Sequence, residues 1–334
     1  MSYMALESAQ APESVTRFLQ HNNLALIDFG KRMRAASPRV IITSARGSSD
    51  NAAGYFKYLT EILTGIPCCS IGASVVSIYD AKLQVTGGLC VTISQSGKSP
   101  DVVALQDAAR SAGALTVALV NVEGSPVARN ADICLPLCAG PEQSVAATKS
   151  LIVSLAAGAA MVAHWLGQPA LLDAVNALPD ALYNATKIDW PEAVALAKAA
   201  ESLYVLGRGP CLPIAAETAL KLKETCSIHA EAYSVAEVMH GPLELLGKDF
   251  PVLVYSPNDQ SRETTRMAVR KMRMTGAEVR VVGDDGLPFA PTGHALLDPI
   301  SMIQTSYRFI EVTAQKLGRN PDRPRLLKKV TETM

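Results

Sequence analysis

GLCVTISQSGKSPDVVALQDAARSAGA, residues 88–114, is the stretch that decides the fold. Its first part, 88–93, is a short apolar run typical of a buried strand, and residues 101–114 have the apolar spacing of an amphipathic helix. The turn between them, SQSGKS at 94–99, carries three serines and a glycine. A chain of such strand–turn–helix units predicts an open parallel sheet with helices on both faces.

The serine-rich turn predicts an anion site. The first N–H groups of a helix have no partner inside the helix, and the helix dipole adds partial positive charge there. Together with serine hydroxyls these groups favour an anion, most often a phosphate. A serine-rich turn can also be an ordinary helix cap. The remainder of the chain favours the phosphate.

The chain contains this unit twice. Arg46-Gly47 recurs as Arg208-Gly209, 162 residues later, and the block 90–120 parallels 252–282. Detecting such a repeat constrains the whole fold. The second copy has SPNDQS at 256–261 in place of SQSGKS, without the glycine and with an added acid. We therefore expect only the first copy to hold phosphate.

These patterns predict an α/β protein with two tandem doubly wound parallel-sheet domains, each a three-layer αβα arrangement. Ligands of such sheets bind at the carboxyl ends of the strands, where both turns lie. The expected segments are N-terminal helices at 1–35, a first domain at 36–170, a second domain at 190–320 and a tail or lid at 321–334. The expected link between the two domains is residues 165–190.

Composition excludes several classes of protein. Lysine plus arginine equals aspartate plus glutamate at 31 each, so nothing indicates general attraction to nucleic acid or to an anionic membrane. The seven cysteines have no metal-ligand spacing, which argues against zinc, and predict reduced, mostly buried thiols of a cytosolic protein. We expect no metal or organic cofactor. We expect no signal peptide. The apolar segment 151–163 predicts a buried helix too short to span a bilayer.

A charged stripe follows the glycine turn of the second copy. Residues 214–231 predict a helix on which Glu217, Lys221 and Glu224 are spaced i, i+4, i+7 and share one face. A solvated helix face is the ordinary explanation. The surrounding alanines and the position after a glycine turn favour a site instead. A carboxylate can move a proton between adjacent carbons while an ammonium stabilises the enediolate oxygen.

Two histidines follow the stripe. His240 precedes Gly-Pro, which ends any helix, so we expect it on an exposed loop where it can act as an acid or base. His229 is predicted to lie inside the helix and to be structural.

With these residues assembled, the whole chain resembles the sugar isomerase (SIS) phosphosugar-binding family. Within it, the chain is most similar to the isomerase part of the glucosamine-fructose-6-phosphate aminotransferases and to the stand-alone glucosamine-6-phosphate deaminases. The matching strings are RGSS (46–49), SQSGKS (94–99), VAATK (145–149), ETALKLKE (217–224), HAEAY (229–233), HGPLEL (240–245) and PRLLKK (324–329).

The resemblance implies roles for these residues. The residues expected around the phosphate are Ser48, Ser49, Ser94, Gln95, Ser96 and Ser99, and those expected to contact the sugar are Val145 and Ala147. It implies Glu224 as the base between C1 and C2, with Glu217 and Lys221 beside it. His240 would assist ring opening across a homodimer interface, and Lys329 would be the lysine that can form a Schiff base.

The chain also departs from the family pattern. Lys98 replaces an acid in the serine turn, and Ala147 replaces a serine near the sugar. We expect no glutaminase domain, and therefore no ammonia from glutamine.

The implied activity is conversion of glucosamine 6-phosphate to fructose 6-phosphate and ammonia. The open alternatives are simple isomerisation, ammonia-dependent synthesis, deamination of galactosamine 6-phosphate, deglycation of a fructosamine phosphate, and non-catalytic sensing of a phosphosugar.

Overall fold

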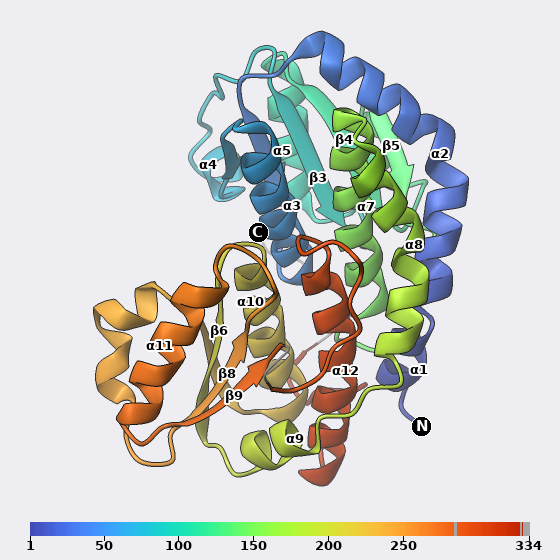
Figure 1. The fold of residues 1–334 in the computed structure, drawn as a ribbon. Helices are drawn as coiled ribbons and strands as arrows, with labels where there is room; N and C mark the ends of the chain where they lie inside the picture. The colour runs from blue at the N-terminus through green and yellow to red at the C-terminus, as the bar shows by residue number, and fades with distance from the viewer. Residues whose placement is uncertain (284–285, 328, 330–334) are drawn as a thin grey trace. The chain divides into compact units, whose positions relative to one another are not determined.

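The computed structural model describes residues 1–283, 286–327 and 329 (Figure 1). These residues divide by packing into two compact units, each built around its own parallel sheet. The N-sheet unit comprises 13–142 and 149–176; the C-sheet unit comprises 1–12, 143–148 and 177–329. In the expected tail at 321–334, Lys328 and residues 330–334 lie outside the described part of the chain.

The N-sheet unit has the strand order β2-β1-β3-β4-β5, all parallel. Its strands are β1 (Ile41–Ser44), β2 (Cys68–Ser70), β3 (Leu89–Ser94), β4 (Leu115–Val120) and β5 (Ile133–Pro136). Its helices are α2 (Ala11–Ala36), α3 (Ser48–Thr64), α4 (Ser74–Ser77), α5 (Pro100–Ser111), α6 (Pro126–Asn130), α7 (Lys149–Leu166) and most of α8 (Pro169–Ala185).

Burial on both faces explains why these strands are apolar throughout. Every residue of β1 and β3 is buried. Helix α3 packs with α7, whereas α5 packs with α4 and α6, and α3 and α5 both contact the strands. Since strands covered on both faces have no solvent side, they show no alternation of apolar and polar residues.

Helix α7 corrects one expectation. It extends over 18 residues, beyond the apolar segment 151–163, and is long and apolar enough to cross a membrane by length and composition. Inside the protein 89% of it is buried. A buried core helix can have the same length and apolar composition as a membrane-spanning one. The alanines and Gly158 of α7 allow close packing against Phe56 of α3.

The C-sheet unit has the strand order β7-β6-β8-β9, again parallel, and so repeats the order of the first four strands of the other sheet. Its strands are β6 (Ser202–Gly207), β7 (His229–Ser234), β8 (Pro251–Tyr255) and β9 (Glu278–Val282). Its helices are α1 (Tyr3–Ala9), α9 (Pro191–Lys198), α10 (Cys211–Lys221), the π-turn η1 (Leu222–Cys226), the 3-10 turns η2 (Glu237–His240) and η3 (Pro242–Leu245), α11 (Arg262–Met274) and α12 (Asp298–Lys316).

Helices also cover both faces of this sheet. Helix α10 packs on β6 and β7 and against α12, while α11 contacts β9, and Figure 1 shows α11 and α12 on opposite sides of β8 and β9. The predicted fold class, two tandem domains with parallel sheets between helices, is confirmed.

The helix predicted for 214–231 was wrong in its second half. Helix α10 ends at Lys221, the chain makes a π-turn, and Ser227 adopts a left-handed conformation with φ 56°. Residues 229–234 then pair with β6 in parallel. The ladder satisfies their backbone groups, so His229 lies exposed on a strand rather than inside a helix.

The N-terminal segment forms helices, as predicted, but its first helix belongs to the C-sheet unit. The N–H groups of Tyr3 and Met4 both donate to the carboxylate of Asp322, each at 2.8 Å. This carboxylate caps the first turn of α1, where helix N–H groups have no internal partner. Most of the segment expected to link the domains, 165–190, forms α8.

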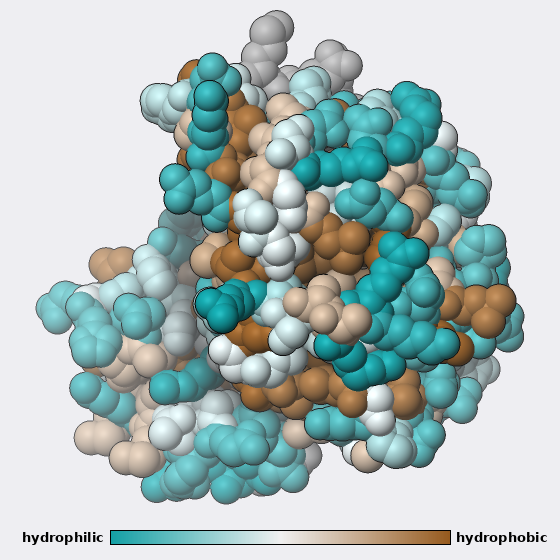
Figure 2. Space-filling model, turned by 90° about the horizontal axis from the view of Figure 1, so that it is seen from above, coloured by the Kyte–Doolittle hydropathy of each residue, from teal (hydrophilic) through white to brown (hydrophobic). Residues whose placement is uncertain are grey.

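The molecular surface is mixed in polarity. Figure 2 shows hydrophobic side chains among hydrophilic ones on the face drawn there. The most exposed large apolar side chains near α4 are Ile78 at 63% and Tyr79 at 77%.

Candidate functional site

Two turns lie at the carboxyl ends of neighbouring strands in the N-sheet unit. Strands β1 and β3 pair in register, with Ser44 opposite Thr92, so the turns that follow them start at one edge of the sheet. The first turn leads into α3 and the second into α5. Both helices begin without a side-chain hydrogen bond at the N-cap, Gly47 and Ser99. The partial positive charge at a helix N-terminus favours an anion.

The second turn depends on Gly97. Its φ is +62°, and a Cβ there would lie 2.2 Å from Ser125 Oγ, so only glycine fits. Ser94 Oγ accepts a hydrogen bond from the Gly97 N–H at 3.0 Å, and Ser96 Oγ accepts from the Lys98 N–H at 3.4 Å. These two hydroxyls therefore shape the turn as acceptors, and each still has an O–H to donate.

Arg46 joins the two turns, and sequence reasoning missed its role. Its Nε donates to Asp101 Oδ2 at 2.8 Å, and its Nη2 forms an ion pair with the same oxygen. Asp101 is 4% exposed and also accepts the Val102 N–H at 2.8 Å. The bridge holds the start of α5 beside the turn that carries Ser48 and Ser49. The arginine in RGSS and the aspartate after SQSGKSP were the available sequence signals.

In the C-sheet unit the charged stripe forms a connected triad. Lys221 Nζ lies 3.3 Å from Glu217 Oε1 and 2.6 Å from Glu224 Oε2. The Glu217 and Lys221 side chains are 0% and 1% exposed, whereas that of Glu224 is 22% exposed. The structure thus confirms that these three residues share one face. The π-turn that starts at Leu222 carries Glu224, and such turns are frequent at functional sites.

Charge pairing keeps Lys221 protonated. Burial alone would lower the pKa of this ammonium, but the carboxylates of Glu217 and Glu224 reverse that effect and raise its pKa above the usual value. Tyr307 donates its phenolic O–H to Glu217 Oε1 at 3.4 Å. The row is therefore a buried cation held between a buried carboxylate and a partly accessible one.

Glu224 lines a cavity of about 740 Å³ within the C-sheet unit. Its wall includes Lys223 of the π-turn and a segment that follows α12. Sequence analysis did not single out the cationic residues of that segment, which are Arg319, Arg323 and Arg325. A cavity of this volume suits a small organic ligand. The combination of carboxylate and cations suits an anionic substrate with an acidic C–H bond.

The C-terminal segment also contacts the residues predicted to bind sugar. Lys329 Nζ donates to the backbone oxygen of Ser144 at 2.6 Å, and the N–H of Val145 donates to the oxygen of Asp322 at 3.2 Å. Val145 and Ala147 are both half-buried. The structure thus places Lys329 beside the segment that carries these two residues.

Glu7 holds the same segment from the other side. Its carboxylate accepts the N–H groups of Gln143 and Ser144, the latter at 3.2 Å, and the side chain is 4% exposed. Glu7, near the start of the chain, therefore has a positioning role within the C-sheet unit.

His240 is the last residue of the 3-10 turn η2 and is exposed. The loop expectation was close, since Gly241 and Pro242 follow and a second 3-10 turn begins there. His240 is not among the residues that line the Glu224 cavity. Across the described ranges of the chain, no group of three His, Cys, Asp or Glu side chains could hold a metal ion.

Comparison with known proteins agrees with this arrangement of two sheets. The family model for the SIS domain matches residues 36–164 and 195–285. The chain is 34% identical over 321 residues to glutamine–fructose-6-phosphate aminotransferase (isomerizing) of Zymomonas mobilis, covering 87% of this chain and 51% of that protein. The chain thus spans about half the length of the curated relatives it matches.

Solved structures give the same result. A protein of Silicibacter pomeroyi that has been proposed as a phosphosugar isomerase superposes with a TM-score of 0.92 at 40% identity, covering 96% of this chain and 100% of that one. Glucosamine-6-phosphate deaminase of Thermotoga maritima superposes with a TM-score of 0.78 at 22% identity, covering 99% and 100%, which shows a shared fold. With two sheets of the same strand order and a family match over both, the chain belongs to the SIS domain family.

Proposed function

We propose that this protein deaminates and isomerises an amino-sugar 6-phosphate, converting glucosamine 6-phosphate and water to fructose 6-phosphate and ammonia. The observation that carries the proposal is the triad: Lys221 is buried between Glu217 and Glu224, and Glu224 lines a cavity large enough for a sugar phosphate. A solvated helix face, the ordinary alternative, does not bury a lysine to 1% exposure.

In the proposed reaction the serine turns of the N-sheet unit bind the phosphate. The residues are Ser48, Ser49, Ser94, Gln95, Ser96 and Ser99, supported by helix starts without side-chain caps. Phosphate binding supplies energy that orients the reacting carbons. Val145 and Ala147 contact the sugar.

Proton transfer between C1 and C2 is assigned to Glu224. After His240 assists ring opening, Glu224 removes the C2 proton of the open-chain sugar, and Lys221 stabilises the negative charge that develops on O1. Glu224 returns the proton to C1, O1 gains a proton to become a hydroxyl, and the amine nitrogen loses one, which leaves an imine at C2. Water adds to that carbon, and the C–N bond breaks to release ammonia. Glu217 keeps Lys221 charged and in place.

Lys329 and His240 complete the proposal. The side-chain nitrogen of Lys329 lies at the Ser144 carbonyl, and as the free amine it is suited to attack the C2 carbonyl of the ketose and form a Schiff base with loss of water. His240 is exposed and outside the Glu224 cavity, which supports its contribution to the site of a partner subunit in a homodimer.

We also propose a reducing, cytoplasmic setting. All seven cysteines are free, and burial raises the pKa of Cys68 and Cys90 to about 12. Thiols of this kind are typical of cytosolic proteins.

The test is ammonia release from glucosamine 6-phosphate by the purified protein, with galactosamine 6-phosphate in parallel. The Glu224→Gln variant should lose about 100- to 10,000-fold in kcat while it binds the sugar phosphate with nearly unchanged affinity. Lys223→Met, a neighbouring cation in the same cavity, is the control and should retain the proton-transfer step. Unchanged kcat in Glu224→Gln would remove this residue from the role of base.

Assays in both directions separate the alternatives. Fructose 6-phosphate with ammonium tests synthesis, and exchange of the C2 proton with solvent tests isomerisation without deamination. Binding of the sugar phosphate with neither ammonia release nor exchange would indicate a sensor and refute the enzymatic proposal.

A further inference from the structure

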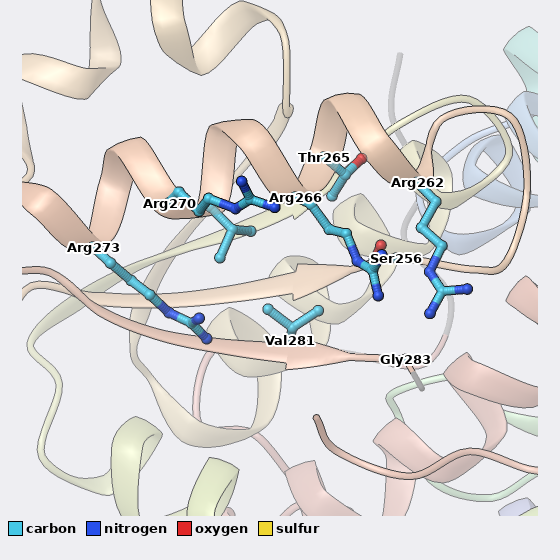
Figure 3. A pocket seen from close by; sticks show the side chains of 9 residues that line it. Ser256, Arg262, Thr265, Arg266, Arg270, Arg273, Val281 and Gly283 are labelled. Atoms are coloured by element: carbon cyan, nitrogen blue, oxygen red, sulfur yellow. The ribbon is translucent and has the colours of Figure 1, made fainter. Parts of the chain in front are cut away.

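A second cavity, of about 320 Å³, lies at the carboxyl edge of the sheet in the C-sheet unit (Figure 3). Its wall includes Ser256, which follows β8, and Val281 and Gly283 at the end of β9. Helix α11 supplies the rest: Thr265, Val269 and four arginines, which are Arg262, Arg266, Arg270 and Arg273. None of the residues assigned to the proposed reaction lines this cavity.

The four arginines occupy one face of α11. Their spacing of four, four and three residues brings them to one side of a helix, over a length of roughly 16 Å. Figure 3 shows the side chains of Arg262, Arg266 and Arg273 extending from α11 toward the side of the strand that carries Val281, while Arg270 lies along the helix. Guanidinium groups match phosphate oxygens in a two-pronged geometry, so a row of them fits a ligand with more than one phosphate.

Neutral acceptors position two of these groups. Arg262 Nη1 donates to Asn258 Oδ1 at 2.7 Å, and Arg273 Nη2 donates to the oxygen of Val279 at 3.3 Å. Arg270 lies 4.0 Å from Glu263 in an exposed ion pair, which is a weak interaction. A guanidinium has five N–H donors, so the same group can be held by protein acceptors and also bind a ligand.

Thr265 gives an independent sign of a missing ligand. Its side chain is 1% exposed and lines the cavity, and Oγ1 has no hydrogen-bond partner within the described ranges of the chain. A buried hydroxyl without a partner is unfavourable, and native structures rarely leave one in place. A ligand oxygen in the cavity would accept its hydrogen bond.

We propose that this cavity binds a small anion with two or more phosphate groups, at a site separate from that of the sugar phosphate. The arginine row supplies the charge, the Thr265 hydroxyl a hydrogen bond, and Val269 and Val281 an apolar wall. The mode of binding differs from that of the first sheet, because here side-chain guanidiniums replace a serine turn. A hollow of this size accommodates a small molecule rather than a nucleic-acid strand.

Calorimetric titration of the full chain with inorganic pyrophosphate tests the proposal, with orthophosphate for comparison. Pyrophosphate should bind about tenfold more tightly than orthophosphate, and Arg266→Ala/Arg270→Ala should lose at least about tenfold in affinity. The control Lys248→Ala/Lys271→Ala removes the same charge from exposed positions outside the cavity and should stay within about twofold. Equal losses in both double variants, or no loss in the arginine variant, would overturn the proposal.

A variant of the serine turn separates this site from the proposed phosphate site of the first sheet. Ser96→Ala/Ser99→Ala should retain pyrophosphate affinity within about twofold. If pyrophosphate binding instead disappears with these serines, the ion occupies the sugar-phosphate site and the proposal fails. Because no sugar chemistry is measured, the result does not depend on the proposed deaminase activity.

Thr265→Val tests the site without altering an arginine. The substitution keeps the side-chain shape and removes the unpartnered hydroxyl, so affinity for pyrophosphate should fall about three- to tenfold while Tm stays equal or rises. If the arginine double variant does not fold, Arg266→Lys/Arg270→Lys replaces it and should also weaken binding. Two results would refute the proposal. The first is full affinity for pyrophosphate in both Thr265→Val and the lysine double variant. The second is binding of single-stranded RNA that depends on the arginines while pyrophosphate does not bind.

Discussion

Replacing Lys221 with methionine tests the buried triad quantitatively. Methionine has a similar length without the charge, so the substitution leaves Glu217, at 0% exposure, without its ammonium. Glu224 keeps partial access to water at 22% exposure, so its loss of the partner is less costly. One uncompensated buried carboxylate therefore dominates the change in stability.

The expected loss in the free energy of unfolding is about 3–5 kcal/mol, the usual cost of removing one partner from a buried ion pair. For domains of about 150–250 residues each kcal/mol lowers Tm by roughly 2–4 °C, which gives a fall of about 6–20 °C. Scanning calorimetry and urea denaturation measure the two quantities. Lys223→Met is the matched control: this lysine is exposed on the same π-turn and its replacement should cost less than about 0.5 kcal/mol.

The double variant Glu217→Gln/Lys221→Met completes the cycle. Glutamine keeps an oxygen that can accept the Tyr307 hydroxyl, and the buried positions 217 and 221 then carry no charge. Since replacing a buried ion pair by neutral groups is often close to neutral, the double variant should recover at least half of the lost stability. The reasoning would be refuted if the double variant lost as much stability as Glu217→Gln and Lys221→Met together. It would also be refuted if Lys221→Met stayed within about 1 kcal/mol of wild type.

Three further predictions follow from individual groups. Glu217 and Glu224 outweigh burial and raise the pKa of Lys221 above 10.5. The stabilisation from this pairing is therefore fully present below pH 10.5 and is lost as the pH rises through the raised pKa. Urea denaturation should show this loss in wild type and not in Lys221→Met. Glu7→Gln weakens the charge-assisted hydrogen bonds from the 143–148 segment and should lower the free energy of unfolding by about 1–3 kcal/mol, as measured by urea denaturation. The control Glu13→Gln, near the start of α2, should lower it little. Equal losses in the two variants would deny Glu7 its positioning role. Cys69 is exposed whereas burial raises the pKa of Cys68 to about 12, so a thiol reagent should modify Cys69 first, and a fast phase that survives in Cys69→Ser would contradict this.

Local patterns were enough to predict β3 and the turn that follows it. The run from Leu89 to Ser94 is apolar because both faces of the strand are covered, and the glycine at 97 marks a backbone conformation that other residues rarely adopt. Equal spacing of repeated blocks extended the prediction to the second sheet. These features are encoded within short segments, so they can be recognised without knowledge of distant contacts.

The end of the charged helix was not predictable in the same way. Residues 222–231 continue a helical pattern in sequence, yet the chain makes a π-turn and enters β7. Pairing with β6, which is distant in sequence, satisfies the backbone of residues 229–234 and outweighs local helix propensity. The same distance effect hid the role of Arg46, whose partner Asp101 lies 55 residues later.

By itself, therefore, the sequence determined the fold class, the two-sheet organisation and the shared helix face of Glu217, Lys221 and Glu224. These depend on periodicity and spacing within a few turns of chain. Only the tertiary structure decided that Glu217 and Lys221 are completely buried, that the segment after α12 lines the Glu224 cavity, and that four arginines of α11 border a second cavity. Burial and cavity walls are produced by segments far apart in the chain, and local pattern carries no information about which of them meet.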